Sequence, residues 1–280
     1  MYPQTRLREF FKRRGRRSRS IGQDGRALPD FIVVGAQKAG TATLFACLAD
    51  HGQVVPSRRR EVHFFDGGLD PTVDSYAKGL GWYAGHFPAA ADLGAAQITG
   101  EASPLYLFNP LAAHRIRATL PGVKLICLLR DPVERAISQY FHEVRLGWED
   151  RPIETAMAEE EALLAPLLRD RAYKALDYIH KSYKARGLYA DQLGPYMRLF
   201  DRRQIYVAQS EAFFQAPADC LNDLCRFLEI TPGYGSDDVP IKNLGWNKTG
   251  VPEAVRSELR AYFAQPNRRL ARLLDAEFAW

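Results

Sequence analysis

The amino-acid sequence predicts an α/β protein, with a P-loop-like, three-layer α/β/α fold around a central, mostly parallel sheet. Continuous apolar runs at 31–34, 123–129 and 204–209 are typical of strands that are covered on both faces. Segments with helical periodicity, such as 188–200 and 217–228, separate or follow these runs. Strands that alternate with helices favour a parallel sheet flanked by helices.

The remaining elements are shorter or less regular. A fourth strand is expected at 97–101, whereas 53–60 is expected to be a loop. Asp131 and Pro132 have the residue types of an N-cap and a first helical position, and Glu134 would complete a capping box. Further helices are expected at 110–120, 152–176, 252–264 and 267–278.

Charge divides the chain unevenly. The 280 residues carry a formal net charge of +5, but residues 1–20 alone hold eight Lys or Arg residues and one acidic residue. We therefore expect a basic, disordered arm over residues 1–28 and a single domain over residues 29–280. The arm has two interpretations, which are a solubilising tail or a peripheral contact with an anionic surface. Nucleic acid is not among the partners we expect.

Nothing in the sequence predicts insertion into a membrane. No apolar run reaches the roughly 18–20 residues of a transmembrane helix, and the basic N-terminus lacks the apolar segment of a signal peptide. The four cysteines have neither the spacing of a disulfide framework nor that of a zinc site, which is typical of a reducing compartment. We therefore expect a cytoplasmic protein.

The segment GAQKAGT at 35–41 connects the first strand to the first helix and is the main candidate for a binding site. Such a loop directs backbone N–H groups and the positive end of the helix dipole to one point, where Lys38 adds its charge. This predicts a phosphate or sulfate site. The nucleoside-triphosphate P-loop places its lysine after the second glycine, whereas Lys38 precedes Gly40, which disfavours an ordinary ATPase or kinase. The alternative is a glycine turn with a solvated lysine.

Further polar groups are expected beside that loop, because ligands of open α/β sheets bind at the carboxyl ends of the strands. Arg130 follows the strand at 123–129, and Glu101–Ser103 end the strand at 97–101. Ser138 lies about two helical turns after Arg130, so the guanidinium and the hydroxyl can hold one phosphate. Two separated anion pockets suit a nucleotide phosphorylated at both its 5′ and 3′ positions. The alternatives are a salt bridge for Arg130 and neutral packing for Ser138.

Several ordered segments resemble the sulfotransferase family, especially its heparan sulfate glucosaminyl sulfotransferase branch. GAQKAGTATL resembles the 5′-phosphosulfate loop of that family, and LICLLRDPVERAISQY resembles its 3′-phosphate motif. EVHFFD and LGWY resemble its acceptor-cleft entry, and AQPNRRLARLLDAEFAW resembles its closing helix. The resemblance covers about residues 31–280. It implies a soluble, bacterial-type sulfotransferase.

The resemblance implies that the donor is 3′-phosphoadenosine 5′-phosphosulfate (PAPS). The loop and its lysine would hold the 5′-phosphosulfate, whereas the arginine and serine of the second motif would hold the 3′-phosphate. A late lysine-glycine loop of the family matches NKTGVP at 247–252, whose alternative is a plain surface turn. The implied donor-binding residues are Gln37, Lys38, Ala39, Gly40, Thr41, Ala42, Arg130, Ser138, Lys248, Thr249 and Gly250.

The resemblance also implies in-line transfer of a sulfuryl group to a hydroxyl or amine of a saccharide, glycolipid or small metabolite. Glu61 occupies the position of the family's carboxylate base, and Lys38 suits the stabilisation of charge on the bridging oxygen. His63 would support Glu61 or contact the acceptor, together with Arg60. The alternatives are an ion pair of Glu61 with a neighbouring arginine and a structural histidine. This chemistry requires no metal, and no residue cluster has convincing metal-ligand spacing.

Two positions depart from the pattern of the glucosaminyl 3-O-sulfotransferases. Ala102 stands where those enzymes have a lysine, and 233–247 lacks the cysteines of their bridged loop. The donor is unaffected by these changes, but heparan sulfate is not implied as the acceptor. Two other function classes stay open. One is a P-loop nucleotide kinase, and the other is a non-catalytic protein that binds anionic glycans through the basic arm.

Overall fold

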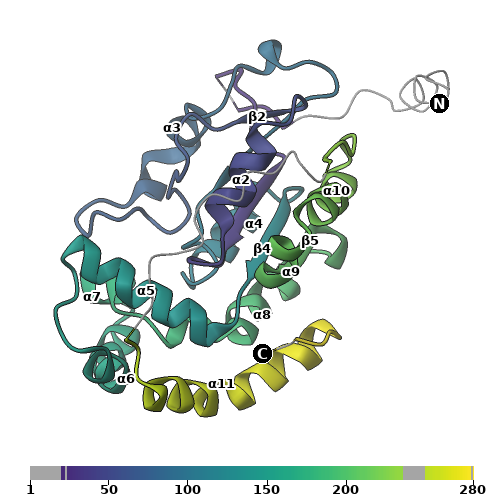
Figure 1. Cartoon of the computed structure of the whole chain (residues 1–280). Coiled ribbons are helices and arrows are strands. Elements are labelled where there is room, and N and C mark those ends of the chain that lie inside the picture. The colour runs from purple at the N-terminus through teal and green to yellow at the C-terminus, as the bar shows by residue number, and fades with distance from the viewer. Residues whose placement is uncertain (1–19, 23, 236–249, 279) are drawn as a thin grey trace.

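The computed structural model describes residues 20–22, 24–235, 250–278 and 280. Its centre is a sheet of five strands in the order β2-β3-β1-β4-β5, and every neighbouring pair is parallel. The predicted α/β/α fold with a parallel sheet is confirmed (Figure 1). The strands are β1 (Phe31–Gly35), β2 (Val54–Pro56), β3 (Ile98–Ala102), β4 (Lys124–Leu129) and β5 (Ile205–Gln209).

Helices cover both faces of the sheet and its carboxyl end. α2 (Thr41–Ala49) and α10 (Pro217–Leu228) contact each other on one side, and α4 (Ala112–Thr119) and α8 (Tyr189–Leu199) contact each other elsewhere on the sheet. The other helices are α3 (Gly79–Ala84), α5 (Pro132–Leu146), α6 (Ile153–Arg169), α7 (Leu176–His180), α9 (Ser210–Gln215) and α11 (Glu253–Leu274). Short 3-10 turns are η1 (Ser75–Lys78), η2 (Ala90–Asp92), η3 (Ala185–Gly187) and η4 (Arg202–Gln204).

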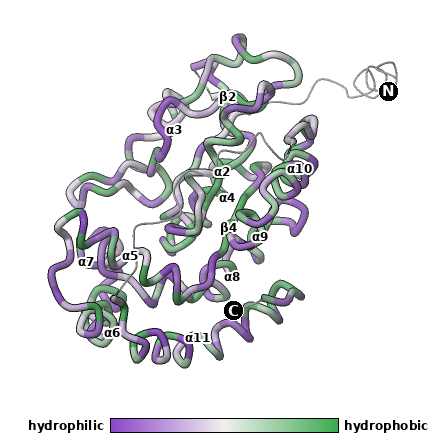
Figure 2. The backbone as a smooth tube through the Cα atoms, viewed as in Figure 1, coloured by the Kyte–Doolittle hydropathy of each residue, from purple (hydrophilic) through white to green (hydrophobic). Residues whose placement is uncertain are grey.

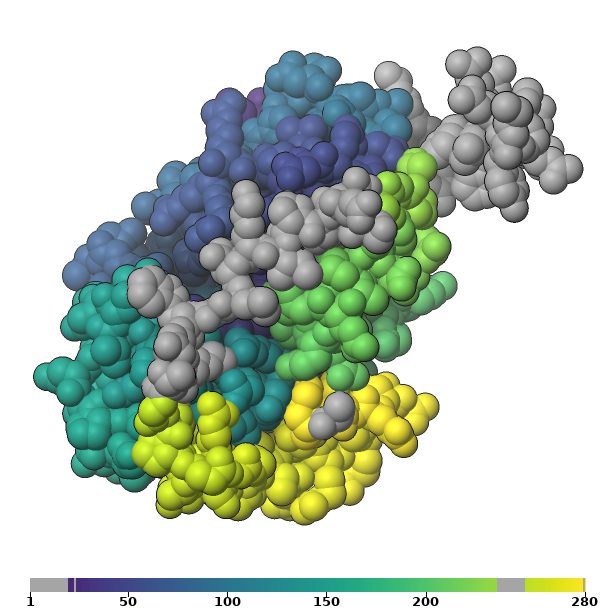
Figure 3. All heavy atoms as spheres, viewed as in Figure 1, coloured from purple at the N-terminus to yellow at the C-terminus, as the bar shows by residue number. Residues whose placement is uncertain are grey.

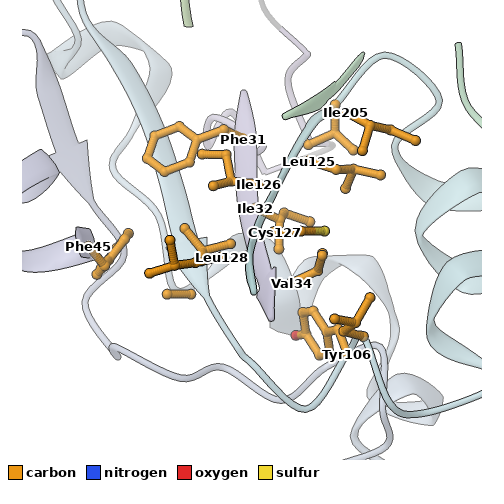
Figure 4. Packing of buried hydrophobic residues seen from close by; sticks show 14 of the residues in the cluster. Phe31, Ile32, Val34, Phe45, Tyr106, Leu125, Ile126, Cys127, Leu128 and Ile205 are labelled. Carbon is orange, nitrogen blue, oxygen red and sulfur yellow. The ribbon is translucent and has the colours of Figure 1, made fainter. Parts of the chain in front are cut away.

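The main core lies between the sheet and its helices. All five residues of β1 are buried, as are the last five of β4, so these central strands have apolar side chains on both faces. Figure 4 shows Phe31, Ile32 and Val34 among Leu125, Ile126 and other residues of the neighbouring elements. The hydropathy colouring of Figure 2 concentrates apolar residues in the same central region.

A second, smaller core holds the helices at the carboxyl end of the sheet. It joins α5, α6 and α11 through buried apolar side chains such as Ile137, Met157 and Phe263. Figure 1 places α5, α6, α7 and α11 together at the lower side of the view, and Figure 3 shows their atoms forming one surface there. An ion pair between Arg256 and Glu134 ties α11 to the start of α5.

Several element boundaries differ from those expected. β2 at Val54–Pro56 falls in the segment predicted as a loop, because three residues are too few for a strand pattern. The helix expected to reach residue 176 ends at Arg169, since Arg171 adopts a left-handed φ of 55°. The two terminal helices expected on either side of Pro266 are one helix, α11. Buried Phe263 and Leu270 hold it to the fold on both sides of the proline.

The start of the described chain is already packed on the domain. Ala27 is fully buried and its N–H donates to the carbonyl oxygen of Pro88 at 3.0 Å. The predicted basic run at residues 1–19 lies outside the described residues, so the division at residue 28 stays a prediction. Among the helices of the described part, none combines the length and the apolar character needed to span a bilayer.

Candidate active site

The candidate site is built where four parallel strands end. β1 continues into the loop with Lys38, β3 into Ser103, β4 into Arg130 and β5 into Ser210. Because neighbouring parallel strands end at the same edge, residues from distant parts of the chain meet there. This arrangement confirms that the loop at 35–41 and the end of β4 share one edge of the sheet.

The loop after β1 presents the start of a helix to this edge. Gly40, with φ of 95°, is the N-cap residue of α2, and Thr41 is the first residue of the helix. A Cβ on Gly40 would lie 2.7 Å from Cζ of Phe214, so the position has no room for a side chain. The first-turn N–H groups of α2 have no acceptors within the helix, which makes this end suitable for an anion.

Two backbone carbonyl groups of the loop accept hydrogen bonds from side chains that follow other strands. Nη1 of Arg130 donates to the carbonyl oxygen of Lys38 at 3.0 Å, and Oγ of Ser210 donates to that of Ala39 at 2.7 Å. A third tether reaches the side chain of Gln37, whose Oε1 accepts from Arg186. Positive charge and N–H donors are therefore gathered at the loop, while two of its oxygens are already satisfied.

Lys38 lies in a strongly cationic environment. Burial lowers the pKa of its ammonium group, and the charges of Arg145, Arg130 and Arg135 lower it further, with Glu143 opposing them. So many cations near one lysine are unfavourable unless an anion lies among them. The charge distribution therefore fits a ligand with phosphate or sulfate groups.

The other side of the site is a chain of hydrogen-bonded carboxylates around His63. Nδ1 of His63 donates to Oδ2 of Asp66 at 2.7 Å, and Nε2 donates to Oε2 of Glu61 at 3.2 Å. Burial alone would lower the pKa of His63, but the hydrogen bonds and charges of Asp66 and Glu61 raise it to about 10. The imidazolium form is thus favoured at neutral pH, and it donates to both carboxylates.

A third carboxylate, Glu101, extends this hydrogen-bonded chain through Ser103. It is fully buried and accepts hydrogen bonds from Tyr83 at 2.7 Å, Ser103 at 2.7 Å and Tyr106 at 3.1 Å. Ser103 also accepts from the backbone N–H of His63 at 3.1 Å. Glu101, which we expected in the ligand crevice itself, therefore lies beneath it. Burial raises the pKa of Glu101, although its hydrogen bonds and the charge of His63 oppose the change.

His142 on α5 is affected by charges from both sides of the site, and it was not among the residues predicted from the sequence. Burial lowers the pKa of its imidazole, and the charges of Lys38 and Arg145 lower it further, while those of Glu143 and Glu61 oppose them. Lys38 and Glu61 therefore both act on one ring of α5. Spacing could have indicated this residue, because His142 is four positions after Ser138 and so shares its helix face. Arg145, whose Nη2 bonds Nδ1 of His142 at 3.0 Å, was missed with it.

Comparison with known proteins then decides the family. A family model described as "Sulfotransferase domain" matches residues 28–249 of the chain, which is more than half of its length. The chain belongs to the sulfotransferase family.

Solved and curated relatives agree with this sulfotransferase assignment. The fold matches the crystal structure of a sulfotransferase from Alicyclobacillus acidocaldarius with a TM-score of 0.72 at 29% identity, covering 90% of this chain and 98% of the other. The membrane-associated sulfotransferase kil1 of Dictyostelium discoideum is 28% identical over 90% of this chain and 66% of its own length. The mouse heparan sulfate glucosamine 3-O-sulfotransferase 6 is 29% identical over 92% of this chain and 75% of its own.

The chain is shorter than several of these relatives. It spans just under two thirds of kil1, and a fifth of a Drosophila melanogaster bifunctional heparan sulfate N-deacetylase/N-sulfotransferase that is 29% identical over 74% of this chain. What the longer sulfotransferases do as whole proteins is therefore not transferred to it directly.

The remaining predicted residues of the sulfotransferase site have different positions. Ser138 is half-buried on α5, and the structure gives its hydroxyl no hydrogen bond within the described residues. Arg60 is exposed, with Nη2 3.6 Å from Oε1 of Glu61. Gly250 is exposed with φ of 94°, whereas Lys248 and Thr249 lie outside the described residues. Asp131 accepts from the N–H of Val133 as the predicted N-cap of α5. In the part of the chain that is described, no group of three His, Cys or acidic residues could hold a metal ion.

Proposed function

We propose that the domain transfers a sulfuryl group from PAPS to a hydroxyl or amine of an acceptor. The observation that carries the proposal is the hydrogen bond between the Arg130 guanidinium and the Lys38 carbonyl. It makes the two predicted anion sites neighbours, as the two ends of a doubly phosphorylated adenosine require. PAPS is the donor used by the sulfotransferase family, and the helix N-terminus with its surrounding cations suits that ligand.

Binding of the donor would divide between the two strand ends. Lys38 and the N–H groups between Ala39 and Ala42 would hold the 5′-phosphosulfate, chiefly those from Gly40 onward, because the Ala39 N–H already donates to the carbonyl oxygen of Ala36 at 3.1 Å. Arg130 would use the donors that do not bind Lys38 for the 3′-phosphate, with Ser138 two turns along α5. The loop around Lys248–Gly250 would cover the nucleotide.

Chemistry would take place between Lys38 and Glu61. The carboxylate of Glu61 would remove the proton of the attacking hydroxyl or amine, and its hydrogen bond with Nε2 of His63 would orient it for that role. The nucleophile would attack sulfur as the bond to the bridging phosphate oxygen breaks, and the ammonium group of Lys38 would stabilise the negative charge on that oxygen.

The acceptor is assigned only by class. The Drosophila and mouse relatives both carry heparan sulfate in their names, and the mouse relative also carries glucosamine, which supports testing amino sugars and saccharides first. Arg60 is exposed beside Glu61, where it would contact the acceptor. Glycolipids and small metabolites complete the acceptor classes we propose. A cytoplasmic location and a peripheral anionic-surface contact of residues 1–20 belong to the same proposal.

A labelled-donor assay tests the function. The full chain would be incubated with PAPS labelled in its sulfuryl group and a panel of amino sugars, oligosaccharides, glycolipids and phenols. We expect label to appear on at least one acceptor without added metal. In parallel, adenosine 3′,5′-bisphosphate should raise the melting temperature more than magnesium-ATP does. The reverse order would favour the nucleotide kinase, and a response only to anionic glycans that vanishes without residues 1–20 would favour the glycan binder.

A further inference from the structure

Arg186 is a buried cation directly behind the donor loop. It lies in η3 with 2% of its surface exposed, and it donates through Nη1 to Oε1 of Gln37 and through Nη2 to the carbonyl oxygen of Ile179. Its guanidinium also lies 5.0 Å from the ring centre of Phe108. Arg186 and Gln37 are 149 positions apart in the sequence.

The placement of this guanidinium is energetically unfavourable in itself. Within the described ranges, Arg186 forms no salt bridge with a carboxylate, and its Nε is buried without a hydrogen-bond partner. Burial lowers its pKa to about 10, and the nearby Arg135 lowers it too, while the charges of Glu143 and Glu160 oppose them without forming an ion pair with it. A buried charge paired only with neutral oxygens costs free energy that a neutral side chain would not. Among the contacts of Arg186, the hydrogen bond to Gln37 is the one that connects it to the donor loop.

Three consecutive loop residues are each tethered by a different element. Arg186 of η3 holds the side chain of Gln37, Arg130 at the end of β4 holds the carbonyl of Lys38, and Ser210 at the start of α9 holds the carbonyl of Ala39. Lys38 meanwhile adopts φ of 69°, a left-handed conformation that is unfavourable for a lysine. The tethers on both sides of Lys38 offset that cost and fix the direction of its side chain.

We propose that Arg186 is a positioning residue of the donor site, which acts through Gln37 on the loop that receives the 5′ end of the nucleotide. This inference rests on the proposed function, because it takes the loop as the 5′-phosphosulfate site. Arg186 does not itself touch the ligand. It keeps Gln37 back from the site and holds the loop in the one conformation that presents N–H groups and the Lys38 ammonium together.

Two ligands that differ at one end of the nucleotide test this role. Adenosine 3′,5′-bisphosphate has the 5′-phosphate that the loop would receive, whereas adenosine 3′-monophosphate lacks it. Binding of each would be measured by calorimetry with the full chain and with Arg186→Met, Gln37→Met and the double variant. Arg169→Met, at an exposed position on α6 with 74% of the side chain accessible, removes the same charge far from the loop and is the matched control.

We expect each single variant to bind the bisphosphate about tenfold more weakly and the 3′-monophosphate within twofold of the unmodified chain, as loss of one charge-assisted hydrogen bond suggests. The double variant should be no weaker than Arg186→Met, because both changes remove one contact. Equal losses for the two ligands, additive losses in the double variant or no loss at all would overturn the proposal.

The outcomes separate this inference from the proposed function. If the unmodified chain fails to bind the bisphosphate, the proposed function fails and the role of Arg186 fails with it. If the unmodified chain binds and the variants match it, only the role of Arg186 fails. Should Arg186→Met not fold, Arg186→Lys takes its place, because it keeps the charge and loses the fork of donors that reaches Gln37; binding of both ligands as tight as in the unmodified chain would then overturn the role.

Discussion

The two sides of the site manage their charges in opposite ways. Around Lys38, cations from β4 and α5 gather, and they lower the pKa of its ammonium group with one carboxylate opposing them. Around His63, each carboxylate is already matched, because Asp66 and Glu61 both accept from the same ring. Without a ligand, the side around Lys38 has an excess of positive charge, whereas the charges around His63 are paired with one another.

This difference indicates how each side would contribute to transfer. The side around Lys38 supplies binding energy for an anionic donor, since adding negative charge there relieves repulsion among the cations. The side around His63 supplies a base held in one geometry, because its partners leave Glu61 little freedom to turn. Variants on the donor side should therefore change affinity and rate together, and variants around Glu61 should change rate alone.

Replacing the base tests this contrast most strongly. Glu61→Gln keeps the size of the side chain and removes its ability to take a proton, so kcat should fall by about 10²–10⁴. The dissociation constant of adenosine 3′,5′-bisphosphate, measured by calorimetry, should stay the same. Glu154→Gln at an exposed position of α6 is the matched control. A parallel loss of nucleotide affinity would make Glu61 a structural residue.

Removing the loop lysine should have the next largest effect. Lys38→Ala takes away the charge expected on the bridging oxygen, and kcat with labelled PAPS should fall by about 10²–10³. Nucleotide affinity should fall as well, because the ammonium group also contacts the 5′ end. Lys181→Ala, at a half-buried position where the lysine pairs with Asp177, serves as the control. Near-normal turnover of the Lys38 variant would remove the loop from the mechanism.

The arginine at the end of β4 should mainly affect affinity. Arg130→Ala removes both the expected 3′-phosphate contact and the bond to the Lys38 carbonyl, so adenosine 3′,5′-bisphosphate should bind about 10²-fold more weakly. Adenosine 5′-monophosphate, which has no 3′-phosphate, should lose much less. Calorimetry with both nucleotides measures this. Identical losses would place the 3′-phosphate elsewhere.

The histidine between the carboxylates should make stability depend on pH. Since its pKa is raised from 6.5 to about 10, the stabilisation from its charged form is complete below about pH 6.5 and is lost as the pH rises through about 10. The free energy of unfolding should therefore fall from pH 6.5 to 10 in the unmodified chain more than in His63→Gln. Denaturant titrations at several pH values measure the difference. Parallel curves would show that His63 is neutral.

The smallest expected effect concerns the tether on the Ala39 carbonyl. Ser210→Ala removes one neutral hydrogen bond, worth about 1 kcal/mol, so the nucleotide should bind about fivefold more weakly. The affinity for the acceptor should not change. Binding as tight as in the unmodified chain would mean that the loop keeps its conformation without this tether.

Local patterns in the sequence predicted the sheet and the loop well. The run that became β1 is apolar throughout and that of β4 is apolar after Lys124, and the glycine loop precedes a helix directly, so neighbouring residues carry both signals. β2 was missed because it is short, and α11 was divided because a proline usually interrupts a helix. Tertiary packing decided both cases.

The chemistry of the site was predicted less completely, for a related reason. Lys38, Arg130 and Glu61 lie in motifs that can be recognised along the chain. The contacts of Glu101 come from Tyr83 on α3 and Tyr106 beyond β3, and no pattern in the sequence indicates that these hydroxyls meet. Arg186 and Gln37 are still further apart. Only the fold brings such pairs together.

The carboxylate chain has a practical consequence for engineering. Every member of it, from Glu61 and His63 to Glu101 and Tyr106, comes from one continuous stretch of the sequence. A chimera that exchanges residues 57–109 as one block between family members would keep all of these hydrogen-bonded partners together. Crossovers inside that block would separate buried partners and produce insoluble protein.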